Sequence, residues 1–246
     1  MPERPVWMIT GATSGFGRAV AEAALDTGAA VVAAVRRPDG LGDLADRVSV
    51  VRLDTTDLDA MPAVVEQVLA DHGRIDVLVN NAGRGHLGAL EEATDAELRQ
   101  LMDLHFFGPA ALTRLVLPGM RERRSGAIVQ MSSMGGRTTF AGVGAYSATK
   151  YALEGWSEAL AAEVRPFGIH VVIVEPGAFR TGFNQSGAIL SSDPMPAYED
   201  QTGPLRETFA TQDGQQPGDP AKAARAIART LRSTSRSWLR TAAGSR

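Results

Sequence analysis

Short, continuous apolar runs recur along this chain, and they constrain its fold more than any other feature. They span residues 6–10, 30–35, 48–53, 75–79, 127–131 and 169–174. Runs that are apolar at every position, rather than at every second one, are typical of parallel strands with both faces buried. Segments with helical spacing, such as 60–70, 97–121 and 146–164, lie between them. This alternation predicts a doubly wound α/β fold with about seven parallel strands and helices on both faces, the last strand lying near 236–241.

The length of the chain bears on its domain organisation. At 246 residues it suits one α/β domain, so we predict that residues 1–246 form a single unit. Residues 184–217 stand apart, because they are rich in Ser, Gln, Gly, Pro and Asp and carry only a weak helical stretch near 205–210. A segment of that length and composition is typical of a substrate loop or lid, although a connecting loop without a role fits it too.

Several helix ends can be recognised from their capping residues. Thr94 followed by Glu97 has the spacing of a capping box, and Asp219 before Pro220 predicts an N-cap with proline in the first turn. Gly168 predicts the end of the helix that occupies 146–164.

Composition and charge exclude several classes of protein. A formal net charge of -3, spread over the chain, argues against a nucleic-acid partner or a charged membrane surface. The sequence has no cysteine, which excludes disulfides, thiol nucleophiles and zinc–thiolate sites, and its 4 histidines lack metal-ligand spacing. No apolar run approaches the ~20 residues of a membrane span, and residues 1–4 lack the order of a signal peptide. We therefore expect a soluble, cytoplasmic protein with neither a metal nor a membrane partner.

A glycine-rich turn directly follows the first apolar run and opens a helical segment. Its spacing, Gly-x-x-x-Gly-x-Gly, is one residue longer than the common dinucleotide fingerprint. Glycines let the backbone approach a pyrophosphate, which free N–H groups and the positive end of the helix dipole then hold. A glycine cluster can also be only a tight turn, but this one lies between a strand and a helix, which favours a dinucleotide site. The predicted contacts are Gly11, Thr13, Ser14, Gly15, Phe16 and Gly17.

The end of the second apolar run indicates which dinucleotide binds. Val35 occupies the position where a carboxylate would hold the ribose hydroxyls of NAD, and Arg36 and Arg37 follow it. A guanidinium fork suits the 2′-phosphate of NADP. We therefore predict NADP(H) in preference to NAD(H), with Arg36 as the main phosphate ligand. Arg37 is the weaker candidate, because arginines are common at strand ends on the surface.

Two further motifs complete a resemblance to a known family. Asn80-Asn81-Ala82-Gly83 follows the fourth apolar run, and Tyr146-Ser147-Ala148-Thr149-Lys150 begins a helical segment. Together with the glycine turn, and in the same order from about residue 6 to 181, they closely resemble the classical short-chain dehydrogenase/reductase family. The resemblance implies a single-domain Rossmann fold and an oxidoreductase that passes hydride between a nicotinamide and a carbonyl or alcohol.

Tyr146 and Lys150 suit that chemistry on physical grounds. They lie one helical turn apart and share a face, which brings an ammonium near a phenol. A positive neighbour lowers the pKa of a phenol from its usual value of about 10. We therefore predict a lowered pKa for Tyr146, which would exchange a proton with the substrate oxygen as a general acid and base.

The family resemblance implies roles for other residues. Ser133 would hydrogen-bond the substrate oxygen, with Ser132 as a less well matched neighbour, and Lys150 would also contact the nicotinamide ribose. Asp54 matches the position that touches adenine, although an aspartate followed by Thr55 could equally be a cap. The remaining cofactor contacts implied in this way are Asn81, Ala82, Gly83, Tyr146, Pro176, Gly177 and Thr181.

One position departs from the family pattern. The family's fourth catalytic residue, an asparagine, is replaced by His105, which lies on the apolar stripe of its helix and is expected to point inward. Pro109 has no N–H, so the carbonyl of His105 would be free to hold a water in a proton relay to Lys150. Two alternatives are a core histidine with satisfied hydrogen bonds and an imidazole that itself joins the relay. His86, just beyond Gly83, is expected to be a surface loop residue rather than part of the substrate pocket.

These observations predict an NADP(H)-dependent ketoreductase that acts on a small ketone or alcohol. Residues 175–181 and the helix near Phe106 resemble the branch with hydroxysteroid and retinol dehydrogenases, which implies an apolar or aromatic substrate. An NADP-binding regulator without turnover is the alternative from another class, and an isomerase or dehydratase is a third. The resemblance also implies a homodimer or homotetramer, with the helices near Phe106 and Trp156 as candidate contacts.

Overall fold

A parallel sheet forms the centre of the computed structural model, which describes residues 4–183, 188–211 and 213–233. In spatial order its strands are β3 (Ser49–Arg52), β2 (Ala30–Val35), β1 (Val6–Thr10), β4 (Val77–Asn80), β6 (Gly126–Met131) and β7 (Ile169–Val174). Neighbouring strands pair in parallel throughout. The doubly wound fold predicted from the sequence is thus confirmed, with six strands in the described sheet. The further strand predicted near 236–241 lies outside the described residues.

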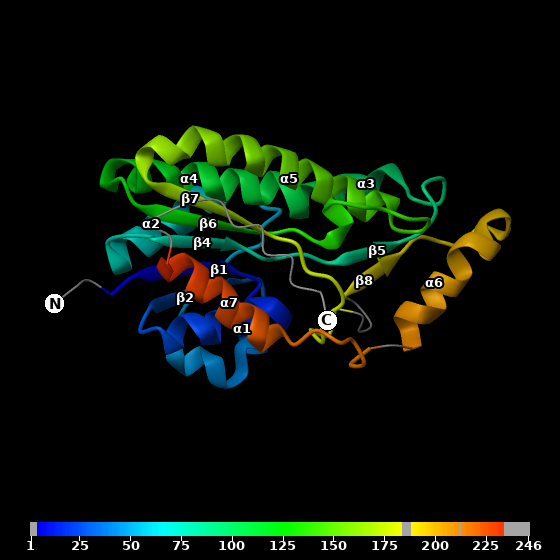
Figure 1. Ribbon diagram of the computed structural model, residues 1–246, viewed down its shortest axis with the longest axis horizontal. Coiled ribbons are helices and arrows are strands. Elements are labelled where there is room, and N and C mark those ends of the chain that lie inside the picture. The colour runs from blue at the N-terminus through cyan, green and yellow to red at the C-terminus, as the bar shows by residue number, and fades with distance from the viewer. Residues whose placement is uncertain (1–3, 184–187, 212, 234–246) are drawn as a thin grey trace.

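Helices cover both faces of this sheet (Figure 1). They are α1 (Gly15–Asp26) and α7 (Pro220–Ser233) on one face, and α2 (Met61–His72), α4 (Gly108–Arg123) and α5 (Gly144–Val164) on the other. Alternate residues of each strand are buried against opposite layers. Trp7 and Ile9 pack with α1 and α7. Val6 and Met8 pack with α2, α4 and α5. This two-sided burial is the reason why the strands are apolar at every position.

The predicted helix ends are confirmed. The hydroxyl of Thr94 accepts the backbone N–H of Glu97 at 3.2 Å, and the carboxylate of Glu97 accepts that of Thr94 at 2.7 Å. Asp219 accepts the N–H of Ala221 at 2.9 Å, and Gly168, with a φ of 68°, ends the turn that follows α5. Four short 3-10 segments complete the connections, namely η1 (Pro38–Arg47), η3 (Met134–Gly136), η4 (Arg165–Phe167) and η5 (Pro196–Tyr198).

A π-helical turn interrupts the helix predicted over 97–121. The helix α3 (Asp95–Met102) leads into the π-helix η2 (Asp103–Phe107), and α4 follows directly. At this point the N–H of Gly108 bonds to the carbonyl of Asp103, five residues back instead of four. A Cβ at Gly108 would lie 2.2 Å from the carbonyl oxygen of Thr55, so this position requires glycine. Turns of this kind occur frequently at functional sites, and this one contains His105.

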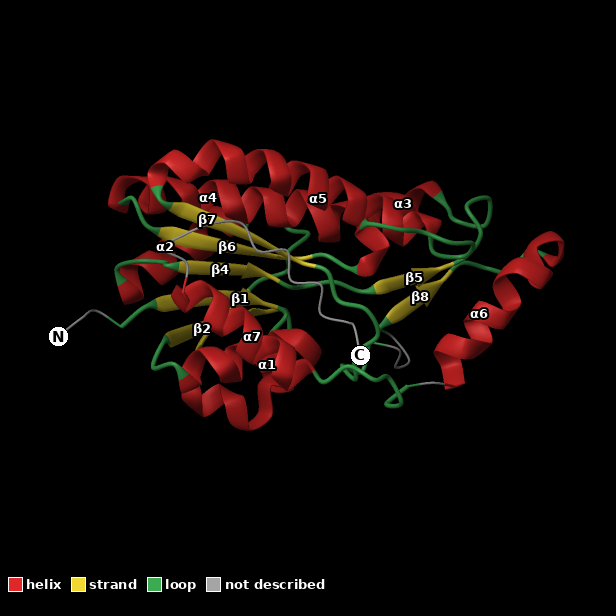
Figure 2. Ribbon diagram, in the orientation of Figure 1, coloured by secondary structure: helices red, strands yellow, loops and turns green. Residues whose placement is uncertain are grey.

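Residues 184–217 contain more regular structure than the sequence indicated (Figure 2). A short strand, β8 (Ile189–Ser191), pairs in parallel with β5 (Gly85–Leu87). The helix α6 (Glu199–Thr211) begins well before the weak stretch predicted near 205–210. The strands β5 and β8 have only 3 residues each, too few for a periodic pattern, which is why neither strand was predicted. Both lie beyond the carboxyl ends of the main strands (Figure 1), the edge at which parallel sheets bind ligands.

A buried ion pair fastens α6 to the body of the protein. The guanidinium of Arg206 lies 2.8 Å from a carboxylate oxygen of Glu92, whose side chain is fully buried. Glu92 also accepts the backbone N–H groups of Ala89 at 2.6 Å and Met195 at 2.8 Å. Arg206 donates a second bond, at 3.0 Å, to the carbonyl of Ser192. A single carboxylate therefore joins the loop before α3, the segment after β8, and α6.

Replacing Glu92 with alanine should loosen α6, because it leaves the largely buried guanidinium of Arg206 without its carboxylate. Removing one partner of a buried pair typically costs about 3–5 kcal/mol. We expect faster tryptic cleavage after Arg206 and a lower melting temperature, measured by gel and by circular dichroism. Glu91→Ala is the matched control, because Glu91 is exposed and contacts only Tyr198 among the bonds identified for it. Equal cleavage rates in the two variants would contradict the assignment.

Candidate active site

A cleft of about 1410 Å³ opens at the carboxyl edge of the sheet. It brings together residues that are far apart in the sequence and that the motifs singled out. The predicted residues that line it are Gly11, Thr13, Ser14, Gly15, Phe16, Arg36, Arg37, Asp54, Asn81, Ala82, Gly83, His105, Ser133, Tyr146, Lys150, Pro176, Gly177 and Thr181. One cleft therefore unites the glycine turn, the predicted phosphate ligands and the predicted catalytic group.

Gly17 is the exception among these residues, and its contact with a cofactor stays a prediction. It does not line the cleft, and a Cβ at this position would lie 2.2 Å from the carbonyl oxygen of Gly11. Gly17 therefore serves the close packing of α1 against the turn. Gly11 and Gly15 have positive φ angles of 68° and 55°, which residues with side chains rarely adopt.

The amino terminus of α1 fits the pyrophosphate of a dinucleotide. Ser14, its N-cap residue, forms no side-chain capping bond, so the first turn of α1 keeps its N–H groups directed toward the cleft. A Cβ at Gly15 would lie 3.0 Å from the carbonyl oxygen of Thr181, so the turn packs closely against the segment after β7. The glycine turn and the first turn of α1 thus form a backbone cradle, a set of N–H groups that suits the negative charge of a pyrophosphate.

Asn81 holds this cradle in place. Its side-chain amide donates to the carbonyl oxygens of Thr10 at 2.9 Å and Gly11 at 3.2 Å. The backbone N–H groups of Asn81 and Ala82 both donate to the hydroxyl of Thr10, each at 2.9 Å. The ends of β1 and β4 are therefore linked at the point where the order of strands along the chain reverses, the usual ligand position in such sheets.

Arg36 and Asp54 lie at the far end of the cleft. The Arg36 side chain is 64% exposed, and its guanidinium is 3.8 Å from the carboxylate of Asp54. Asp54 also accepts the N–H of Thr56 at 3.0 Å and its hydroxyl at 2.8 Å, so it has the bonds of the cap that its sequence allowed. Partial burial acts to raise the pKa of Asp54, but these bonds and the charge of Arg36 hold it below the usual value. The guanidinium remains free to turn toward an anion in the cleft.

Ser133, rather than Ser132, faces Tyr146. The Ser133 hydroxyl accepts the N–H of Gly135 at 3.0 Å, and it acts to lower the pKa of the Tyr146 phenol. The Ser132 hydroxyl instead donates to the buried carboxylate of Glu154 at 2.6 Å. The structure thus separates two adjacent serines that the sequence alone could only rank.

The prediction of a lowered pKa for Tyr146 is wrong for this structure. Burial raises the pKa of the phenol to about 12, and Ser133 offsets only part of that effect. The ammonium of Lys150 lies 5.7 Å from the centroid of the Tyr146 ring and donates to the carbonyl of Met131 at 2.9 Å. The shared helix face therefore places Lys150 near the ring, but removal from water is the largest influence on the pKa of the phenol.

Lys150 is itself strongly perturbed. Burial lowers the pKa of its ammonium to about 8, and the negative charge of Glu154 acts in the opposite direction. The carbonyl of Met131 accepts one of its three protons. A lysine in this state can gain or lose a proton near neutral pH, as catalytic lysines do.

His105 has partners at both ring nitrogens. Its Nε2 accepts the backbone N–H of Arg84 at 3.2 Å, so its Nδ1–H donates to the hydroxyl of Thr149 at 2.8 Å. That hydroxyl donates in turn to the carbonyl of Tyr146 at 2.7 Å. Burial, followed by the charges of Lys150 and Arg84, holds the pKa of His105 far below its usual value, so the ring is neutral. The imidazole anchors the π-helix to α5, and a relay through the carbonyl of His105 stays a prediction.

His86 corrects another expectation. It lies in β5 with only 1% of its surface exposed and lines the cleft, so it is not a surface loop residue. Its Nε2 is 3.0 Å from the hydroxyl of Ser192, and burial lowers its pKa. The pairing of β5 with β8 buries this ring, and that pairing joins segments about a hundred residues apart, which no local pattern reveals.

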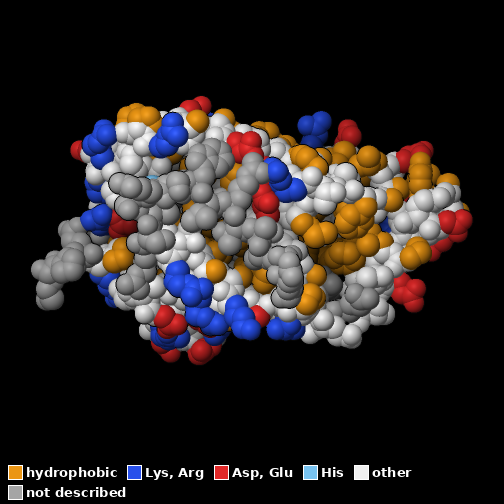
Figure 3. Space-filling model, in the orientation of Figure 1, with side chains coloured by type: hydrophobic (Ala, Val, Ile, Leu, Met, Phe, Trp, Pro, Cys, Tyr) orange, Lys and Arg blue, Asp and Glu red, His pale blue; other side chains and the backbone are white. Residues whose placement is uncertain are grey.

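An apolar wall of the cleft, whose members the motifs did not identify, includes Phe183 near Tyr146. Phe183 has its ring centroid 6.3 Å from that of Tyr146. The other members are Leu87, Leu104, Phe140, Val143, Ile189 and Phe209. Hydrophobic side chains also gather on the surface around the β5–β8 end of the molecule (Figure 3). The side of the cleft next to Tyr146 therefore suits an apolar molecule.

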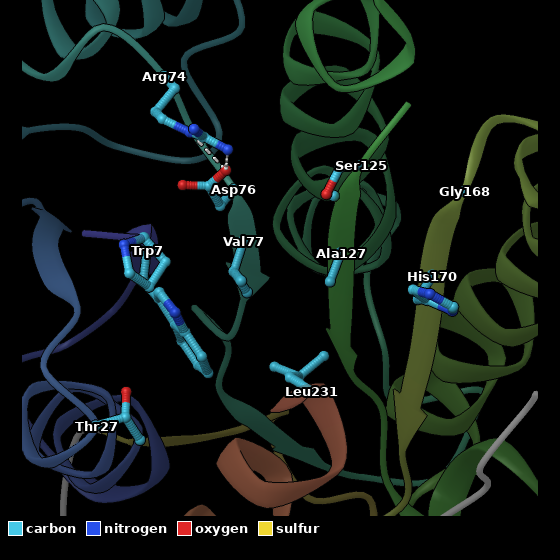
Figure 4. Close-up of a pocket in the computed structure, with 12 residues that line it drawn as sticks. Trp7, Thr27, Arg74, Asp76, Val77, Ser125, Ala127, Gly168, His170 and Leu231 are labelled. Atoms are coloured by element: carbon cyan, nitrogen blue, oxygen red, sulfur yellow. Dashed lines mark hydrogen bonds and ion pairs between the residues drawn. The ribbon is translucent and has the colours of Figure 1, made fainter. Parts of the chain in front are cut away.

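A second hollow, of about 400 Å³, lies at the opposite edge of the sheet (Figure 4). Trp7, Val77, Ala127, His170 and Leu231 line it from several elements. No residue that the motifs singled out lines this hollow. Parallel sheets bind their ligands at the carboxyl ends of strands, so the large cleft is the functional candidate.

Within residues 4–183, 188–211 and 213–233, no cluster of three or more His, Asp or Glu side chains could hold a metal ion. In the same part of the chain, no helix has the length and apolar character needed to cross a bilayer.

Comparisons with known proteins agree with this site. The sequence model of a family described as short chain dehydrogenase matches residues 5–188. A short-chain dehydrogenase structure from Streptomyces avermitilis is 53% identical, with a TM-score of 0.89 over 97% of this chain and 88% of that one. The structure titled ElxO with NADP bound is 25% identical, with a TM-score of 0.78 over 96% of this chain and 94% of that one. A 3-ketodihydrosphingosine reductase from Bacteroides thetaiotaomicron is 44% identical over 180 residues, which is 73% of this chain and 65% of the reductase.

The Rossmann sheet, together with the family model and the reductase relatives, places the chain in the class of NAD(P)-dependent oxidoreductases. Within that class, the chain belongs to the short-chain dehydrogenase/reductase family.

Replacing Lys150 with methionine should stabilise the protein at neutral pH. Its folded pKa of about 8 lies below the ordinary 10.5, so the unfolded chain binds more protons between these values and stability rises with pH in that window. Burying the ammonium thus lowers the free energy of unfolding at pH 7 by on the order of 3 kcal/mol. The hydrogen bond to Met131 offsets part of this cost. We expect a higher melting temperature for the variant at pH 7 and a smaller advantage at pH 9.5, measured by circular dichroism. Lys222→Met, at an exposed position, is the control; an equal effect of both changes would refute the assignment.

Proposed function

We propose that this protein is an NADP(H)-dependent reductase of ketones, which passes hydride between a nicotinamide and a carbonyl or alcohol carbon. The observation that supports it most is that Ser133, Tyr146 and Lys150 line the same cleft as the glycine turn and Arg36. A group that can hand a proton to an oxygen thus faces the same space as a site suited to a dinucleotide.

Each residue of the group has a separate task. A raised pKa keeps Tyr146 protonated at neutral pH, which is the form needed to donate a proton to a carbonyl oxygen. Ser133 orients that oxygen and stabilises its developing charge. Lys150 places positive charge beneath the ring of Tyr146, which favours phenolate once the proton has left. When bound, the nicotinamide supplies the hydride.

The preference for NADP(H) rests on the end of β2. Val35 leaves the ribose site without the carboxylate that holds NAD, and Arg36 and Arg37 line the cleft beside it. The similarity to ElxO, which has a solved structure with NADP bound, supports the same cofactor.

The substrate class follows from the apolar wall. Phe183, Ile189 and Phe209 approach the cleft from the segment that β8 and α6 hold in place. We infer an apolar ketone, and the named activity of the Bacteroides relative, a ketone reductase, supports reduction of that class. Residues 184–217 would then form part of the substrate site.

An NADP-binding regulator is the second candidate. The glycine turn and Arg36 would serve it equally well, but it would not require a serine, a tyrosine and a lysine grouped around one point. Turnover is therefore the property that separates the two candidates.

Tyr146→Phe should abolish ketone reduction while leaving NADPH bound, because the phenylalanine has no proton to give. We expect turnover to fall by about 10²–10⁴-fold, followed as NADPH absorbance with a panel of aliphatic and aromatic methyl ketones. Tyr151→Phe, at an exposed position on the same helix, is the matched control. Tight NADPH binding by the wild type, with no oxidation by any ketone, would favour the regulator.

Arg36→Ala should weaken NADPH binding by about 10–100-fold, because a charge-assisted bond to a phosphate is worth roughly 1.5–3 kcal/mol. NADH binding should change little. Fluorescence titration with both nucleotides measures the difference, and Arg47→Ala, at an exposed position outside the cleft, controls for overall charge. Equal loss of affinity for both nucleotides would refute the role of Arg36.

A further inference from the structure

Glu154 is a buried carboxylate for which the reaction outlined above has no task. It lies one helical turn after Lys150 on the buried stripe of α5, with 4% of its surface exposed. Carboxylates are rarely buried to this extent unless a specific partner compensates for the lost water. Its surroundings therefore indicate what it does.

The carboxylate of Glu154 lies where the end of β6, the turn η3 and α5 meet. The Ser132 hydroxyl donates to it at 2.6 Å, directly beside Ser133. A Cβ at Gly136 would lie 2.2 Å from the same carboxylate oxygen, so the backbone of η3 packs directly against it. Glu154 thus fastens the stretch of chain that carries Ser133 to the helix that carries Tyr146.

Lys150 is held against the same stretch from the other side. Its ammonium donates to the carbonyl of Met131, the residue before Ser132. A carbonyl is neutral, so this bond alone does not balance a buried positive charge. The negative charge of Glu154, one turn away, raises the pKa of Lys150 against the effect of burial.

The other charged or titratable groups identified around this pair belong to residues 4–183. On α5 itself these are Tyr146 and Glu158, and from the π-helix His105, which is neutral, faces Lys150. After η3, Arg137 lies 3.7 Å from Glu154, 3.7 Å from Glu158 and 3.9 Å from Glu175, which follows β7. Of the three carboxylates, Glu154 is the one whose charge acts on Lys150.

We infer that Glu154 is a positioning residue of this site: its carboxylate holds positive charge on Lys150 and fastens the strand end that leads to Ser133. The charge and the hydrogen bond are separable, because an amide in place of the carboxylate still accepts from Ser132. The consequence for catalysis rests on the proposed function, whereas the effect on Lys150 does not.

The sequence offers a direct measurement, because Lys150 and Lys222 are its only lysines. With ¹³C-labelled lysine in a Lys222→Met background, the remaining side-chain signal belongs to Lys150, and its shift against pH reports the pKa. We expect about 8 in the parent protein, the value that burial sets. Glu154→Gln should lower it by about one unit, because a nearby opposite charge is lost. Glu158→Gln is the matched control and should leave it unchanged.

Unchanged titration of Lys150 in Glu154→Gln would overturn the inference. If Glu154→Gln does not fold, Arg137→Met can be measured instead, because Arg137 is half-exposed and its replacement is less disruptive. Removing the cation that competes for Glu154 should raise the pKa of Lys150, and no rise would overturn the inference equally.

Kinetics separate this inference from the proposed function. With a ketone that the parent protein reduces, the alkaline limb of kcat/KM should move to lower pH in Glu154→Gln. Ser132→Ala should lower kcat without moving that limb. An unmoved limb in Glu154→Gln would overturn the charge role. Absence of turnover in every protein would refute the reductase alone, because the lysine titration still decides the role of Glu154.

Discussion

Both faces of the parallel sheet are buried under helices, and this constraint decides where the protein can carry out chemistry. Helices return the chain to the same starting edge after each strand, so the carboxyl ends collect the loops of β1, β4, β6 and β7 side by side. The glycine turn, the segment after β4 and Ser133 occupy equivalent places at this edge. The cleft therefore contains residues from most of the chain. Each of these residues follows the carboxyl end of a strand.

Within the cleft, polar groups are buried with particular partners rather than in water. Lys150 uses a carbonyl and a neighbouring carboxylate, and His105 uses a backbone N–H and a hydroxyl. Such groups reduce stability, because each gives up its hydration, and sites of this kind commonly exchange stability for function. The same burial that costs stability moves the pKa of Lys150 toward neutrality and keeps Tyr146 protonated.

Features encoded locally could be predicted. The strands carry a continuous apolar pattern because two layers bury them, and Tyr146 and Lys150 share a face because an α-helix repeats every 3.6 residues. The pKa of Tyr146 could not be predicted, because it is set mainly by removal of the phenol from water, with Ser133 acting in the opposite direction. The burial of His86 depends on β8, which meets β5 only in the folded chain.

The sequence by itself determined the kind of fold, the order of the strands along the chain, and the motifs predicted to bind a dinucleotide and to donate a proton. These depend on periodicity and spacing, which act over a few residues at a time. Only the tertiary structure decided that Ser133 rather than Ser132 faces Tyr146, that both nitrogens of His105 are engaged, and that α6 is pinned through Glu92. Each of these contacts joins residues that are far apart in the sequence. Such residues meet, and lose their contact with water, only when the helices pack against the sheet.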